Sequence, residues 1–272
     1  MIVGVSSGNN GQEGGSMFRT EYKSADEIKF SMRNYERIGI LSCSVCANLS
    51  DTGGKKGLEL MKGLCEEWGK DVTGFLVFGA CVGSLMEYTM SKYIEPIRSR
   101  LDALLVISCA GGIKASNLYS PGLPIVAACD SFGSMPLTPR GGSHDSLVVD
   151  ALCPICDDGH CVISYTAGIC PVTECPLESR YGFCENPPKA GSRKCTQDPG
   201  RNCVWVEIGE EAGKRGVDIK VLQELKLIHQ DEVPKRMPSL VRQKAPLPLK
   251  KAAQFVTGEL FNPYADFIHW TR

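Results

Sequence analysis

Several features are scarce or missing in this sequence, and each absence removes a class of function. Acidic and basic side chains nearly cancel over the 272 residues, giving a net charge of −1. The composition therefore lacks the excess of basic residues that is typical of nucleic-acid-binding proteins. No run of about 18 apolar residues occurs, which predicts that no segment spans a membrane. The first residues have neither a cationic start nor a long apolar stretch, so no secretory signal is expected. A cytoplasmic location follows, where thiols stay reduced.

Motifs for nucleotide binding and for covalent catalysis are missing as well. No G-x-G-x-x-G follows a predicted strand, and no G-x-x-x-x-G-K-[ST] occurs. Lys55 and Lys56 could bind an anion at the start of a helix, although a solvated charge pair is the commoner reason for such lysines. No cysteine–histidine pattern of a hydrolase is present. No residue is therefore predicted to be catalytic.

Cysteine, in contrast, is abundant, with fourteen in the chain. In a reduced compartment this number indicates metal ligands rather than disulfides. Eight of them crowd into residues 153–203, where few large aliphatic side chains are available to form a core. We therefore expect this segment to fold only with bound metal. The eight are Cys153, Cys156, Cys161, Cys170, Cys175, Cys184, Cys195 and Cys203.

Short apolar runs alternate with helical patterns through residues 36–140, which we treat as one domain. Such strands, nearly continuously apolar and separated by helices, predict an α/β fold with a small parallel sheet flanked by helices. A capping box at Ser24 and Glu27 predicts a helix in the preceding N-terminal arm, residues 1–35. An apolar period predicts another helix over 57–69. The predicted strands are 37–42, 75–78, 104–107 and 124–128.

A cysteine follows each of the predicted strands. Because the carboxyl ends of parallel strands meet at one edge, where such folds place ligands, these thiols are expected to converge. Cys43 and Cys46 also have the C-x2-C spacing that lets two thiolates bind one metal. We predict an iron–sulfur cluster here; the alternative is small buried residues filling a tight edge, as for Cys65 on the apolar face of its helix. The predicted edge ligands are Cys43, Cys46, Cys81, Cys109 and Cys129.

The cysteine-rich region, residues 150–231, is predicted to be a loop-dominated metal-binding domain. Its eight thiols could form two four-ligand sites, or one iron–sulfur cluster and one zinc site, and their spacing does not assign them. His160 could be a zinc ligand, although a surface histidine is the commoner case. Two helices are expected after Cys203, the second near 218–231.

The C-terminal extension, residues 232–272, combines a proline-containing linker with a tail rich in aromatic side chains. Proline cannot donate a backbone hydrogen bond, so the linker is expected to run extended. An apolar tail beyond such a linker can dock on its own core or on a partner. We predict docking on another chain.

Several elements of the cysteine-rich region resemble a known family. They are C-P-V-T-E-C-P from Cys170, G-F-C ending at Cys184, Cys195, and N-C-V-W around Cys203. They are similar to the C-terminal domain of microbial methylenetetrahydrofolate reductases, which also occurs as a separate subunit beside the flavin-bearing reductase in acetogens and related anaerobes. The stretch ILSCSVCANLSDTGGKKG resembles the first loop of that subunit, with Ser50 standing near a position where a further cysteine is expected.

The resemblance implies a protein that binds one or more iron–sulfur clusters, [4Fe-4S] being the expected type, with zinc as a further candidate. It implies an electron-transfer and scaffold subunit of a one-carbon oxidoreductase complex, passing electrons toward a flavin-bearing partner and contacting further electron-transfer subunits. Two alternatives stay open: a zinc-stapled interaction module, and an accessory protein of corrinoid-dependent methyl transfer.

Overall fold

The protein was analysed as a computed structural model, which describes residues 16–78, 83–136, 160–231 and 269–270. Its centre is a sheet of four parallel strands in the order β5-β4-β2-β3. The chain winds outward from β2 to β3 on one side and from β4 to β5 on the other. The direction of winding therefore reverses between β2 and β4, which is where open α/β sheets bind ligands. The strands are β2 (Arg37–Cys43), β3 (Asp71–Phe78), β4 (Ala103–Ile107) and β5 (Ile125–Ala127).

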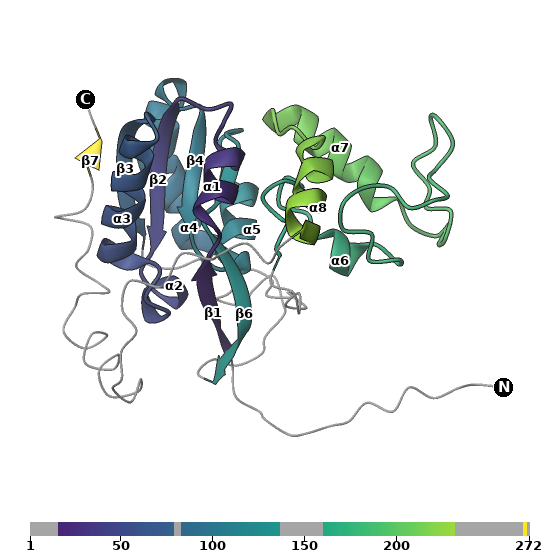
Figure 1. Cartoon of the computed structure of the whole chain (residues 1–272). Coiled ribbons are helices and arrows are strands. Elements are labelled where there is room, and N and C mark those ends of the chain that lie inside the picture. Colours follow the sequence, from purple (N-terminus) through teal and green to yellow (C-terminus); the bar gives the residue numbers. More distant parts are fainter. Residues whose placement is uncertain (1–15, 79–82, 137–159, 232–268, 271–272) are drawn as a thin grey trace.

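Helices cover both faces of this sheet, as Figure 1 shows, so the predicted α/β class is confirmed. Alternate side chains of β2 point to opposite faces, the period expected of a strand. Leu41 packs into a core with Met86 of α4 (Gly83–Thr89). Ile40 packs into a second core with Leu58 and Met61 of α3 (Gly54–Glu67). After α4 come a π-helical turn, Met90–Ile94, and a 3-10 helix, Glu95–Arg100, and α5 (Ala110–Tyr119) follows β4.

The N-terminal part contains the helix that its capping box predicted and a strand that the apolar pattern did not predict. β1 (Ser16–Tyr22) pairs antiparallel with β6 (Cys129–Pro136), and α1 (Ala25–Ser31) follows. Ser24 Oγ accepts a hydrogen bond from the Glu27 amide at 3.1 Å, as a capping box requires. The Glu27 carboxylate does not complete the box, because it pairs with Lys23 at 2.8 Å.

The cysteine-rich region lies beside the sheet, near α1 and α5 (Figure 1, green). It contains α6 (Pro171–Glu174), α7 (Val204–Arg215) and α8 (Val221–Asp231), so both helices expected after Cys203 are present. Their apolar faces form a core in which Trp205, Ile208 and Leu225 are buried. The apolar surface that residues 153–203 lack is thus supplied largely by the two helices that follow them.

Of the C-terminal extension, the structure describes β7 (His269–Trp270), which pairs antiparallel with β3 of the same chain. At these two residues the extension pairs with its own chain. The reason is that β3 is otherwise the edge of the sheet, and an edge strand offers backbone groups that need partners. The rest of the linker and tail lies outside the described residues. Within the described part of the chain, none of the helices is long and apolar enough to cross a membrane.

Candidate metal centre

Three predicted edge ligands lie where the winding of the sheet reverses. Cys43 is the last residue of β2, and Cys46 begins the short helix α2 (Cys46–Leu49). Cys109 follows β4 as the N-cap of α5. All three are buried and belong to one core. β2 and β4 are neighbours, with Ser42 opposite Ile107, so Cys43 and Cys109 leave the sheet side by side. Cys81 lies outside the described residues.

The surroundings of Cys43 favour a cation next to its sulfur. Burial first, and the thiolate charge of Cys109 second, raise the pKa of Cys43 to about 11. The Val45 amide donates to Cys43 Sγ at 3.4 Å, and it and the Ala47 amide lower that pKa in part. A thiol in this position stays protonated at neutral pH unless a metal ion displaces the proton. N–H donors around a sulfur are also among the groups that set the potential of a bound cluster.

The loop that carries Cys43 and Cys46 is held tightly against α3. The Ala47 carbonyl accepts hydrogen bonds from the Thr52 amide and the Gly53 amide, both at 2.9 Å. Gly53 is required by close approach, because a Cβ there would lie 2.5 Å from the Cys43 carbonyl oxygen and 2.6 Å from Ala47 Cβ. Ser42 Oγ donates to the Gly54 carbonyl at 2.8 Å. The two thiols are thus placed by a rigid turn.

The cysteine-rich region brings two further thiols to this core. Cys161 and Cys170 are half-buried and pack against the cluster that contains Cys43, Cys46 and Cys109. The backbone of Cys161 is fixed at both ends, since its amide donates to Asp130 Oδ1 at 3.0 Å and its carbonyl accepts from Lys23 Nζ at 3.0 Å. Cys170 is the N-cap of α6. Both parts of the protein therefore contribute thiols to one core.

Cys129 is placed differently. It begins β6, opposite Tyr22, and packs into the core beneath α3 rather than the one that holds Cys43. Burial raises its pKa, against a hydrogen bond from Thr52 that lowers it. Cys65, which the sequence assigned to the core, is fully buried on α3 in the same cluster.

A second group of cysteines lies in the core of the cysteine-rich region. Cys195 and Cys203 are buried there, and Cys175 packs against the same core. An antiparallel bridge between Lys194 and Asn202 places Cys195 and Cys203 near each other. Cys203 occupies the N-cap position of α7, and its side chain makes no capping hydrogen bond. Cys184 is half-buried, with its thiol 3.5 Å from the Asn186 carbonyl; Cys153 and Cys156 lie outside the described residues.

The distances between these thiols bear on which metal group would fit. No disulfide joins the described cysteines. Zn–S bonds of about 2.3 Å in a tetrahedron put thiolates roughly 3.8 Å apart. Among the residues that the structure describes, no three cysteine sulfurs lie within 4.8 Å of one another. An iron–sulfur cluster places its own irons and sulfides between the thiolates and so needs them farther apart. The described cysteine sulfurs therefore do not form a compact three-thiolate group as they stand.

A buried polar network, which the sequence did not predict, joins the sheet to the cysteine-rich region. Lys23 Nζ lies 2.8 Å from both Glu27 Oε1 and Asp130 Oδ1, and all three side chains are at most 2% exposed. His160, for which the sequence favoured a surface position, is buried and stacks on His229 of α8. His160 is buried rather than exposed because α1 and α8 pack over it. Nothing in the sequence links His160 to a histidine 69 residues later.

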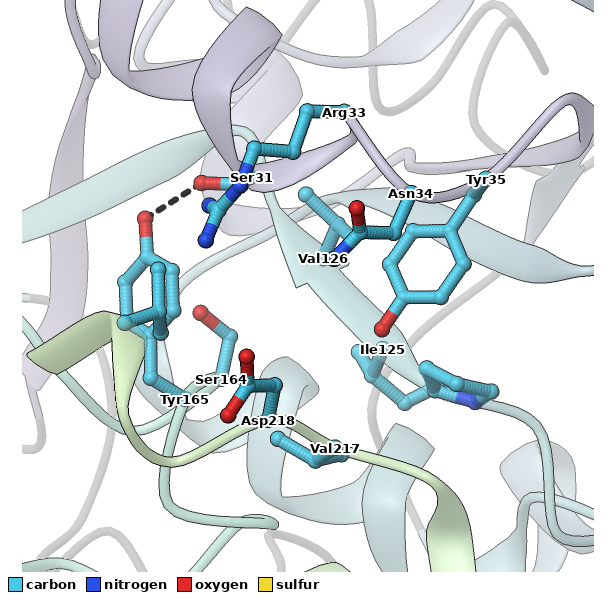
Figure 2. Close-up of a pocket in the computed structure, with 12 residues that line it drawn as sticks. Ser31, Arg33, Asn34, Tyr35, Ile125, Val126, Ser164, Tyr165, Val217 and Asp218 are labelled. Atoms are coloured by element: carbon cyan, nitrogen blue, oxygen red, sulfur yellow. Dashed lines mark hydrogen bonds between the residues drawn. The ribbon is translucent and has the colours of Figure 1, made fainter.

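A small pocket of about 30 Å³ lies near this network, beside the start of β5 (Figure 2). It is formed by the end of α1, the start of β5 and the cysteine-rich region. Tyr165 lines it, with its hydroxyl 2.5 Å from Ser31 Oγ and 3.1 Å from Glu27 Oε1. No cysteine is among the residues that line this pocket.

Comparison with protein families identifies the cysteine-rich region. Residues 137–230 match the model of the family described as "Methylene-tetrahydrofolate reductase C terminal". This match agrees with the resemblance that the cysteine motifs carry, and it supports a role related to methylenetetrahydrofolate reductase and one-carbon chemistry. Comparisons with the curated proteins and with the solved structures gave no match.

Proposed function

We propose that this protein is an iron–sulfur electron-transfer and scaffold subunit of a methylenetetrahydrofolate reductase-type complex. The observation that carries the proposal is the position of Cys43 and Cys109 on the two strands between which the winding reverses. The family match of residues 137–230 supports the reductase-type context. A flavin-bearing subunit is the proposed partner.

Two groups of thiols would hold the clusters. Cys43, Cys46 and Cys109 would bind one at the sheet edge, completed by Cys161 or Cys170 from the cysteine-rich region. Cys175, Cys195 and Cys203 belong to the second group. A bound cluster supplies one-electron transfer. The chain itself contributes N–H donors at Cys43 Sγ and a dry environment on the sheet side.

The half-buried cysteines indicate where electrons would leave the protein. Cys161, Cys170, Cys175 and Cys184 are all partly exposed, in contrast to Cys43 and Cys109. Exposed apolar side chains lie in the same region, with Phe183 50% exposed beside Cys184. We therefore place the contact with the flavin-bearing subunit on the cysteine-rich region.

The proposal is tested by transferring electrons between the two subunits. The full chain is purified anaerobically, reduced with dithionite, desalted and mixed with the oxidised flavin-bearing reductase subunit of the same organism. Loss of flavin absorbance in a rapid-mixing experiment is the expected result. The Cys109→Ser variant should transfer electrons at least tenfold more slowly, whereas Cys65→Ala, which alters a buried thiol on α3, should retain the wild-type rate.

The alternatives give different outcomes. A colourless wild-type protein that contains zinc and no iron would contradict the proposal in favour of a structural module. Iron-containing protein that binds a corrinoid protein and leaves the flavin oxidised would contradict it in favour of an accessory of methyl transfer.

A further inference from the structure

Three potential metal ligands meet between α1 and α8, apart from the thiols. Glu27 comes from α1, His160 from the segment leading into Cys161, and His229 from α8. One ligand atom of each lies within 4.8 Å of those of the other two. The side chains of Glu27 and His229 are 1% and 2% exposed, and His160 is 5% exposed. Two imidazoles and a carboxylate are thus gathered in a site that water barely reaches.

The orientation of His229 points one ring nitrogen into the group. Its Nδ1 lies 2.9 Å from the Tyr181 hydroxyl. Nε2 is buried 3.5 Å from Glu27 Oε2, so in the tautomer in which Nδ1–H donates to Tyr181 its lone pair faces that carboxylate oxygen. A lone pair facing a carboxylate oxygen repels it unless a cation or a proton lies between. Ligating histidines are commonly held in this way, by an oxygen acceptor on the other ring nitrogen.

The second histidine is aligned with the first. The rings of His160 and His229 stack with their centroids 4.0 Å apart and their planes inclined by 14°. Ligand atoms bound to one zinc ion at about 2.0–2.1 Å lie roughly 3.4 Å apart in a tetrahedron. A spread of at most 4.8 Å is close to that value, but an imidazole binds an ion in the plane of its ring, so one of the two stacked rings has to turn out of the stack before both can bind one ion.

The charges of the network leave room for a cation. Glu27 Oε1 is used by Lys23 and by the Tyr165 hydroxyl, so Oε2 is the oxygen that faces the histidines. Lys23 also pairs with Asp130. Glu27 Oε2 thus lies on the side of the two histidines, where a cation or a proton can compensate its buried charge.

We propose that Glu27, His160 and His229 form a binding site for a divalent transition-metal ion, with Zn²⁺ as the ion to test. Two imidazoles and one carboxylate are a donor set used for zinc, and also for ferrous iron. The site joins α1 of the sheet domain to α8 of the cysteine-rich region, so bound metal would lock the two together. It uses no thiol and is separate from the proposed clusters.

The test compares zinc binding by variants of the full chain under anaerobic conditions. His229→Gln should lose one zinc equivalent per chain relative to wild type in elemental analysis after Zn²⁺ loading and desalting, with iron content unchanged. Zinc-edge X-ray absorption should show the loss of nitrogen and oxygen neighbours rather than sulfur. Tyr181→Phe removes only the oxygen that orients His229, and should weaken zinc binding about 10–100-fold in competition with a chromophoric chelator.

The matched control is His144→Gln, which alters a histidine outside the trio and should bind as much zinc as wild type. Equal zinc content in wild type and His229→Gln would overturn the proposal and leave the three side chains as an ion pair sharing a proton. If His229→Gln failed to fold, Tyr181→Phe would decide, because an unchanged zinc affinity in that variant would also overturn it.

Discussion

Replacing Lys23 with methionine tests whether the buried ion network holds the two parts of the protein together. Burial alone would lower the Lys23 pKa, but the carboxylates of Asp130 and Glu27 raise it well above its usual value. The lysine is therefore charged in the folded protein. Lys23→Met keeps much of the apolar stem and removes the ammonium, leaving two carboxylates that are 1% and 2% exposed without their cation.

The expected loss follows from what is left behind. Removing one partner of a buried ion pair costs about 3–5 kcal/mol, because the remaining charge stays desolvated. We expect a loss of this size in the free energy of unfolding at pH 7. Anaerobic urea denaturation followed by tryptophan fluorescence measures it, since Trp68 packs under α3 and Trp205 lies in the core of the cysteine-rich region.

Two comparisons make the test specific. Lys62→Met removes a lysine whose pair with Glu66 is 3.2 Å long and 38% and 53% exposed, and it should cost at most about 1 kcal/mol. Lys23→Met combined with Asp130→Asn should be less destabilised than Lys23→Met alone, because one uncompensated charge is gone. A loss for Lys23→Met no greater than that for Lys62→Met would refute the reasoning.

Three further predictions concern other parts of the fold. Gly53→Ala should destabilise the protein by about 1–3 kcal/mol through overpacking against Ala47, and an unchanged melting temperature would contradict this. Arg37 holds the pKa of Asp102 at about 2, below the unfolded value of about 3.9. The stability that this ion pair contributes is therefore present above pH 4 and lost as the pH falls toward 2. Acid titrations should show the gap between wild type and Asp102→Asn closing over that window, and a constant gap would refute the assignment. A chelator under reducing conditions should make residues 160–203 sensitive to protease while the sheet stays resistant, and continued resistance would show that metal does not hold this region.

The parallel sheet could be predicted because its strands are short, apolar and separated by helical patterns. Each predicted strand is present, and β3 is longer than its apolar run, extending from Asp71 to Phe78. The order of the strands could not be predicted, since it depends on which side each crossover takes. β6 was missed because its sequence, CDSFGSMP, is polar and is paired by β1 rather than buried between strands.

The cysteines could be placed at the sheet edge from the strand ends alone, as Cys43 and Cys109 show. Their division between two cores could not, because Cys129 follows a strand as Cys109 does and still packs on the other face. The contact between His160 and His229 also could not be predicted from the sequence. The two histidines meet because α1, α8 and the segment at His160 pack together, and no spacing of residues in the sequence predicts that contact.

Iron and acid-labile sulfide per chain, measured on anaerobically purified protein, test the central claim most directly. Wild-type protein should contain both, and electron paramagnetic resonance of the dithionite-reduced protein should show a reduced cluster. Cys43→Ser and Cys109→Ser should each lose the same fraction of iron and sulfide, because the two thiols serve one site, while Cys65→Ala should keep the wild-type content. Full iron and sulfide in both serine variants would contradict the account.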